Sequence, residues 1–172
     1  IEMMMHHNVV IGATGNSLTH CAAMTRARKN GTRGCTLPGI TDDIFARAMK
    51  VEPEQLHADG NKWIACFPDR HHKVRVVTKI GTDIEFEVGL VPYKNDDAMY
   101  SDAGNVGNIP AGEAYGVPNP GTANGKIVVD ASIGSFPWTE GDPPCTVTVK
   151  NGSACEFEGE RGKALEKMLA SV

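Results

Sequence analysis

Asn8-Val-Val-Ile-Gly-Ala-Thr14 is a short run of apolar, mostly β-branched residues, and it predicts a buried strand. Residues 19–30 are rich in alanine, arginine and lysine and predict a helix that Ser17 or Thr19 caps. Cys35-Thr-Leu37 then predicts a second short strand. Strand, helix and strand at this spacing are typical of the βαβ unit of a parallel sheet. We therefore expect the two strands to be parallel neighbours.

Two further helices are predicted after this unit. Thr41 can cap the first, which closes at Lys50, and the second runs broadly from Pro53 to Phe67. Two strands are too few for a stable doubly wound domain. We therefore expect residues 1–67 to form the C-terminal part of a Rossmann-like parallel domain, a partial βαβ unit whose other strands lie upstream.

The pattern changes at about residue 68, where apolar and polar residues begin to alternate. Period-two alternation predicts half-buried antiparallel strands, and Asn151-Gly152 is a strong signal for a tight hairpin turn. An amphipathic helix is predicted from Glu160 to Ala170. The expected fold is thus α/β plus α+β, with residues 68–172 forming a β-hairpin-rich antiparallel domain and a closing helix. The predicted strands are residues 73–78, 84–88, 126–130, 146–149 and 154–157.

Composition limits the classes of partner. The chain has 172 residues, of which 41% are hydrophobic and 22% charged, and its net charge is −4. Nucleic acid or an anionic membrane would require a concentrated basic face, so neither is an expected partner. The N-terminus lacks the features of a signal peptide, and we expect a cytoplasmic protein. The five cysteines include no C-x-x-C pair and indicate reduced thiols.

Two candidate motifs fail on inspection of the residues. The glycines Gly12 and Gly15 resemble a dinucleotide fingerprint, but Leu18 occupies the position of the third glycine, so a tight turn explains them better. The histidine pairs are adjacent in sequence and seldom share a metal, since neighbouring side chains diverge. His20 follows the first strand, where open α/β sheets present ligand-binding residues. It is either a substrate contact or a polar residue of the first helical turn.

The long segment from Pro92 to Asn124 is rich in glycine and proline, and irregular segments of this length are usually functional. It contains Asn108-Ile-Pro-Ala-Gly-Glu-Ala-Tyr-Gly-Val-Pro118, followed by Asn124-Gly-Lys-Ile-Val-Val-Asp130. Within this string Glu113 is a carboxylate in a loop of restricted conformation, which suits a hard divalent metal ion.

This string resembles the N-[LI]-P-x-G-E-[VA]-[FY]-x-x-P stretch of the aminopeptidase T family of metallopeptidases. Two other stretches, Ser17-Leu-Thr-His20 and Arg75-Val-Val-Thr-Lys-Ile-Gly-Thr-Asp83, are similar to regions of its divergent branch, in the same order. The resemblance implies metal-assisted hydrolysis of N-terminal peptide bonds, with Zn, Co or Mn as the metal. It further implies that Glu113 is a metal ligand, that Asn108 and Tyr115 shape the loop, and that His20 faces the substrate cleft.

The resemblance puts the remaining metal ligands beyond Val172, so we expect an incomplete metal site and no activity from this chain alone. A rival reading is a ring-opening dioxygenase acting on dihydroxypyridines, a class similar to the same family that uses Fe(II). A non-enzymatic interaction module is the third reading. The expected partners are a peptide or small-molecule substrate, and another copy of the chain or a companion fragment that covers the severed sheet.

Overall fold

A computed structural model describes residues 2–67, 71–133 and 139–171. Its contacts divide the chain into two compact units: unit 1 comprises residues 1–67 and 93–115, and unit 2 comprises residues 68–92 and 116–172. The sequence predicts a single domain boundary, after residue 67. In the structure, residues 93–115, which include the Pro110–Glu113 loop, make their contacts within unit 1.

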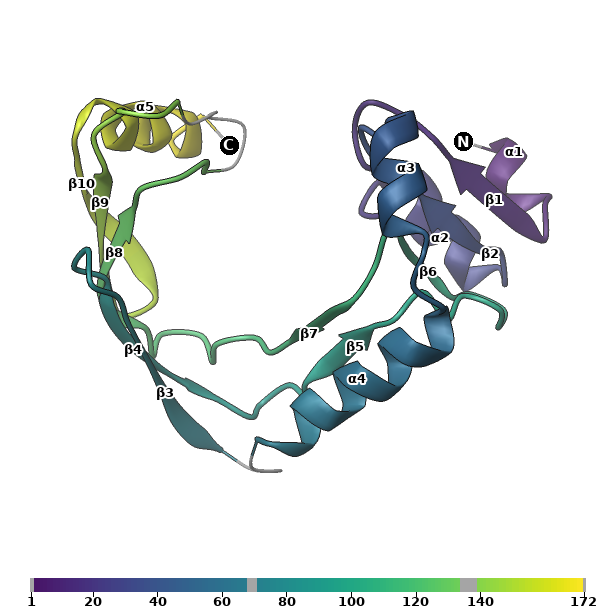
Figure 1. The fold of residues 1–172 in the computed structure, drawn as a ribbon, viewed down its shortest axis with the longest axis horizontal. Helices are drawn as coiled ribbons and strands as arrows, with labels where there is room; N and C mark the ends of the chain where they lie inside the picture. The colour runs from purple at the N-terminus through teal and green to yellow at the C-terminus, as the bar shows by residue number, and fades with distance from the viewer. Residues whose placement is uncertain (1, 68–70, 134–138, 172) are drawn as a thin grey trace. The chain divides into compact units, whose positions relative to one another are not determined.

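Unit 1 is built on a three-stranded parallel sheet in the order β1-β2-β6 (Figure 1). The predicted parallel pairing of the first two strands is confirmed, with Val9 opposite Arg33. The third strand pairs in parallel with β2, on the edge opposite to β1. This strand comes from the segment that the sequence predicts to be irregular, and not from upstream. The bounds are β1 Val9–Gly12, β2 Arg33–Thr36 and β6 Val106–Asn108.

The helix between β1 and β2 is α2, Ala22–Lys29, and a short helix, α1 (Glu2–Met5), precedes β1. Met24 and Ala27 of α2 are fully buried, so its apolar side faces the interior of the unit. The cap is Cys21, whose Sγ accepts a hydrogen bond from the Met24 amide at 3.4 Å. The predicted caps, Ser17 and Thr19, were wrong because the chain makes a further turn before the helix begins.

Two more helices of unit 1 follow β2 as predicted. They are α3, Asp42–Ala48, which Thr41 caps, and α4, Pro53–Ala65, which begins at a proline. In the long segment, β5 (Lys94–Asp96) and β7 (Glu113–Tyr115) form an antiparallel pair that contacts α4. Across the described residues, no helix combines the length and the apolar character needed to cross a membrane.

Unit 2 contains a five-stranded antiparallel sheet in the order β10-β9-β8-β4-β3, with α5 packed against β9 and β10 (Figure 1). Both predicted hairpins and the strand between them are confirmed. At the tight turn, Asn151 and Gly152 have φ values of 49° and 78°, the positive pair that a type I′ hairpin requires. The bounds are β3 His72–Val77, β4 Asp83–Val88, β8 Asn124–Val129, β9 Cys145–Lys150, β10 Ser153–Glu158 and α5 Glu160–Leu169.

The core of unit 2 lies between this sheet and α5. Ile84, Val147 and Val149 contribute from the strands and Leu165 from the helix, each with 8% or less of its surface exposed. The apolar residues that alternate along the strands therefore pack against the apolar side of α5 in one common core. The expected mixed class, a parallel α/β part followed by an antiparallel part with a closing helix, is confirmed.

Candidate functional site

Three polar side chains meet at the carboxyl ends of β2 and β6 in unit 1. The Thr19 and Thr36 hydroxyls lie 2.7 Å apart, and each contacts the side-chain amide of Asn108, at 2.6 and 2.8 Å. We call these residues the Thr19–Thr36–Asn108 cluster. Open α/β sheets bind ligands outside the carboxyl ends of their strands, so the cluster occupies the position expected of a ligand site.

The local sequence explains why the cluster forms. Thr36 and Asn108 are the last residues of paired parallel strands, and the Ile109 amide donates to the Thr36 carbonyl at 2.9 Å. Thr19 reaches them because the loop after β1 packs closely: a Cβ on Gly12 would lie 3.0 Å from Leu18 Cδ1. Thr36 is fully buried and Thr19 is 8% exposed, so both hydroxyls depend on protein partners.

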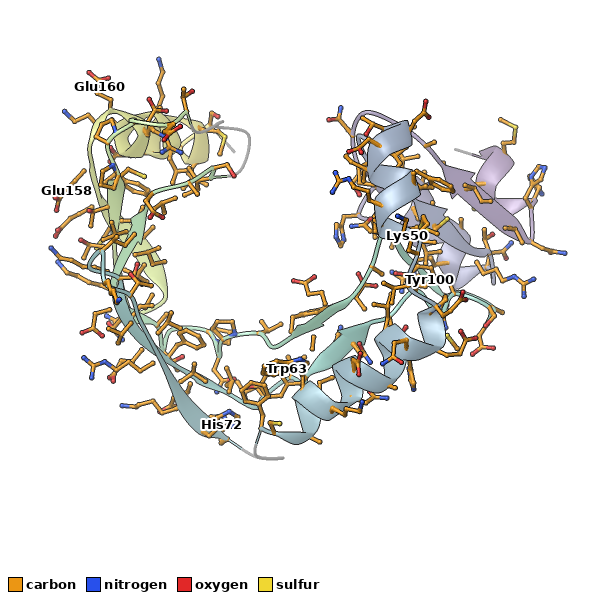
Figure 2. All side chains as sticks on the ribbon, viewed as in Figure 1. Lys50, Trp63, His72, Tyr100, Glu158 and Glu160 are labelled. Carbon is orange, nitrogen blue, oxygen red and sulfur yellow. The ribbon has the colours of Figure 1, made fainter. Side chains whose placement is uncertain are left out.

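Tyr100, labelled in Figure 2, lies in the segment between β5 and β6 and connects that segment to the cluster. Its hydroxyl lies 2.5 Å from Asp96 Oδ1 and 3.0 Å from the carbonyl oxygen of Asn108. Burial, followed by the hydrogen bond to Asp96, raises the pKa of Tyr100 far above its ordinary value, so the phenol stays protonated. The ring fits because residue 107 is glycine: a Cβ there would lie 2.2 Å from the Tyr100 hydroxyl.

A groove of about 370 Å³ runs beside the same strands within unit 1. A volume of this size is at the lower end of the range for small-molecule sites. Burial raises the pKa of the Cys35 thiol in its wall, so this sulfur is an apolar lining atom and not a thiolate. The rest of the groove is lined by β1, by the start of α4, by the segment after β5 and by the residue after β6; the lining includes Val9, Ile11, Pro53, Glu54, Met99, Tyr100 and Ile109.

A hydrogen-bond network joins α4 to β5 and to the residue that follows it. Asn95 Nδ2 donates to Asn61 Oδ1 at 3.1 Å, so the other end of the Asn61 amide donates to His57 Nε2 at 2.9 Å. His57 Nδ1 therefore carries the proton and donates to Asp97 at 2.6 Å. Burial works to raise the pKa of Asp97, but hydrogen bonds from His57 and the Met99 amide hold it below its ordinary value.

All four sequence-predicted site residues belong to unit 1, but only one of them is part of the cluster. Asn108 is a member of the cluster, and His20 is exposed and adjacent in sequence to Thr19. Glu113 and Tyr115 are exposed and lie on β7, where Glu113 pairs with Asp96 of β5. Among the hydrogen bonds of the described residues, none joins Glu113 to the cluster. The proposed roles of these four residues stay predictions.

The residues present do not fit a metal centre on their own. Within residues 2–67, 71–133 and 139–171, no three histidine, cysteine, aspartate or glutamate side chains are grouped so that they could hold an ion. A catalytic metal needs about three protein ligands. Glu113, even with its cross-strand neighbour Asp96, supplies too few.

The family model of NicX, 2,5-dihydroxypyridine 5,6-dioxygenase, matches residues 1–171. The chain belongs to the NicX family. Among curated proteins, no sequence matches the chain. Among solved structures, the fold is similar to that of 2,5-dihydroxypyridine dioxygenase from Pseudomonas putida KT2440, at 18% sequence identity and a TM-score of 0.75. The match covers 98% of this chain but 47% of that one, so the chain spans about half the length of its structural relative.

This finding corrects the aminopeptidase interpretation. The hydrolase and metallopeptidase assignment was wrong, and the rival dihydroxypyridine dioxygenase class is the one that the family match supports. Backbone geometry explains why the Pro110–Glu113 string misled. Gly112 has a φ of 122°, and a Cβ there would lie 3.1 Å from Leu56 on α4, so the loop requires this glycine whatever the chemistry. Such a string identifies a scaffold and not a reaction.

Sequence reasoning missed several polar residues of this site. Thr19 and Thr36 were treated as a cap and a strand residue, and Tyr100 was not considered. One signal was available for Thr36, since a polar residue at the end of a buried parallel strand lies where ligands bind. For Asp97 there was none, because its partner His57 is 40 residues away. Tyr100 has its partner Asp96 only four residues away, but no residue pattern shows that the segment folds so that the two meet.

Proposed function

We propose that the protein acts as a ring-cleaving dioxygenase on a dihydroxypyridine, and that unit 1 binds and orients the ring. The family match over residues 1–171 carries this proposal. The cluster at the strand ends supports it, because it offers directional hydrogen bonding to a small polar ring at the ligand-binding edge of a parallel sheet.

The family name states the balance of the reaction. Cleavage between ring carbons 5 and 6 with both atoms of O₂ retained converts the hydroxyl-bearing carbon 5 to a carboxyl group. Carbon 6 becomes a formyl group on the ring nitrogen. No external reductant is consumed. The family suggests an iron cofactor, but the described residues do not fit one on their own.

The proposed roles of this chain's residues are binding and proton transfer. Asn108 contacts a ring substituent from the end of β6. His20, exposed beside Thr19, holds or accepts the proton of a ring hydroxyl, a task suited to imidazole near neutral pH. Tyr115 and Glu113 are proposed to line the approach to the ring from β7.

The test uses the full-length protein, loaded with ferrous iron under anaerobic conditions and then mixed with 2,5-dihydroxypyridine and ¹⁸O₂. We expect uptake of one O₂ per substrate and a product that carries both labelled atoms. 2-Hydroxypyridine, which lacks the second hydroxyl, should not react. His20→Gln should lower kcat roughly 100-fold, the usual size of one acid–base contribution. A folded, iron-loaded protein that consumes no O₂ with the dihydroxy compound would refute the proposal.

A further inference from the structure

The two hydroxyls of the Thr19–Thr36–Asn108 cluster hold one end of the Asn108 side-chain amide. Both donate to Asn108 Oδ1, Thr19 at 2.6 Å and Thr36 at 2.8 Å. These lengths are typical of O–H···O hydrogen bonds, whereas N–H···O bonds are most often about 2.9–3.0 Å long. The contact between the two hydroxyls needs no third proton, because one hydroxyl proton can be shared by Oδ1 and the neighbouring oxygen. The amide oxygen is therefore the inner end.

The surroundings of the two hydroxyls keep the amide in this orientation. Ser17 Oγ donates to Thr19 Oγ1 at 3.2 Å, so Thr19 accepts from Ser17 and gives its own proton to the cluster. Thr36 is fully buried, so its hydroxyl depends on protein partners. An amide whose oxygen is held by two donors is oriented before a ligand arrives, which lowers the entropy cost of binding.

The outer end of the amide, Asn108 Nδ2, has two hydrogens to donate. Among the described residues it makes no hydrogen bond, and it is not one of the buried side-chain atoms that lack a partner. Because Asn108 is half-buried, this nitrogen is open to solvent at the carboxyl end of β6. We infer that Asn108 Nδ2 is a preoriented donor that binds an oxygen acceptor of the ligand, the oxygen on carbon 2 of a dihydroxypyridine.

The chemistry of the ring explains the choice of oxygen. An NH₂ group binds a carbonyl or a deprotonated oxygen and offers nothing to a cation. In water, 2-hydroxypyridines are mainly in the pyridone form, with a carbonyl at carbon 2 and a hydrogen on the ring nitrogen. Carbon 5 lies across the ring, and its hydroxyl carries a proton that the proposed reaction removes. Identifying the ligand rests on the proposed function; the orientation of the amide does not.

Ligand binding to the full-length, iron-loaded protein tests the donor in the absence of oxygen, where no turnover occurs. The matched probe is 3-hydroxypyridine, which keeps the ring and one hydroxyl but lacks the oxygen on carbon 2. We expect the wild type to bind 2,5-dihydroxypyridine at least about tenfold more tightly than this probe, the effect of one good hydrogen bond. Equal affinities would overturn the assignment of the donor to this oxygen.

Asn108→Asp replaces the NH₂ group by an oxygen of similar size. One carboxylate oxygen still accepts from Thr19 and Thr36, but the outer oxygen repels a carbonyl, so the tenfold preference should disappear. A preference that persists in this variant would contradict the inference. If the variant does not fold, Thr36→Val and Thr36→Ser decide. The valine removes one donor to Oδ1 and should reduce the preference several-fold, whereas the serine should keep it; equal preferences in the two would count against a held amide.

Hydrogen exchange separates the orientation of the amide from the proposed function. In full-length protein labelled with ¹⁵N-asparagine, the Asn108 side-chain signal is assigned by its loss in Asn108→Asp. Without ligand, we expect its NH₂ protons to exchange with water within about threefold of the rate of the exposed Asn16. Exchange at least about tenfold slower would place the nitrogen inside the cluster and overturn the inference. Failure of both pyridines to bind, with exchange still fast, would overturn the proposed function and its ligand and leave the outward donor standing.

Discussion

Replacement of Gly60 by alanine should destabilise the protein, although alanine is the better helix former. Gly60 lies inside α4, where glycine costs about 1 kcal/mol relative to alanine. A Cβ at this position, however, would lie 2.0 Å from Asn95 Oδ1 and 2.6 Å from Asn95 Nδ2. Within the described residues Oδ1 has no hydrogen-bond partner, and it fills the space beside the Gly60 backbone.

The size of the destabilisation follows from the hydrogen bonds that the Asn95 side chain would lose. Moving its amide breaks the hydrogen bonds from Nδ2 to the His57 carbonyl, at 3.0 Å, and to Asn61 Oδ1, at 3.1 Å. Each is worth about 1 kcal/mol, and the Asn61 oxygen then lacks this donor. The loss of about 2 kcal/mol or more exceeds the helix-propensity gain. Gly60→Ala should thus lower the free energy of unfolding by about 1 kcal/mol.

The same substitution should change sign when Asn95 is already alanine. In that background nothing obstructs the new methyl group, and Gly60→Ala should stabilise by up to about 1 kcal/mol. Urea unfolding followed by circular dichroism measures all four members of the cycle, and Ala58→Gly at an exposed position of α4 calibrates helix propensity. Stabilisation by Gly60→Ala of similar size in both backgrounds would refute the packing argument.

Two further predictions concern the same unit. Asp97→Asn should lower the free energy of unfolding at pH 6 by on the order of 1 kcal/mol. The folded-state pKa of Asp97 is lowered, so this stability is present above the unfolded-state pKa and is lost as the pH falls through the folded-state pKa. Urea titrations of wild type and variant should therefore converge once the pH is below the folded-state pKa of Asp97. Gly107→Ala should displace the Tyr100 hydroxyl from Asp96 and lower the thermal midpoint of unfolding. In a Tyr100→Ala background the space is free, so the same substitution should have little effect on the midpoint. An equal decrease of the midpoint in both backgrounds would contradict this cause.

The sequence predicted the elements whose signals are local. Asn151-Gly152 specifies its turn through φ values that these two residues tolerate, and the alternation on either side specifies the strands. The parallel pair β1 and β2 could be predicted for a similar reason, since β-branched residues and the helix between them are contiguous.

The strand β6 could not be predicted in this way. Val106-Gly-Asn108 is three residues long and has no apolar period, and its conformation is decided by the free edge of β2 about 70 residues away. Asn108 was predicted as a site residue, but from a resemblance to an aminopeptidase family whose reaction was the wrong one. Its contacts to Thr19 and Thr36 depend on tertiary structure alone.

The interleaving of the two units has a consequence for folding during synthesis. The chain passes from one unit to the other after residues 67, 92 and 115. A nascent chain that has just left the ribosome with residues 1–67 therefore lacks β6, and the β3–β4 hairpin of unit 2 emerges before that strand does. Unit 1 must wait, with one edge of β2 open, until residue 108 is made. This delay is a period in which that edge can pair wrongly, and chaperones that bind extended apolar segments should act then.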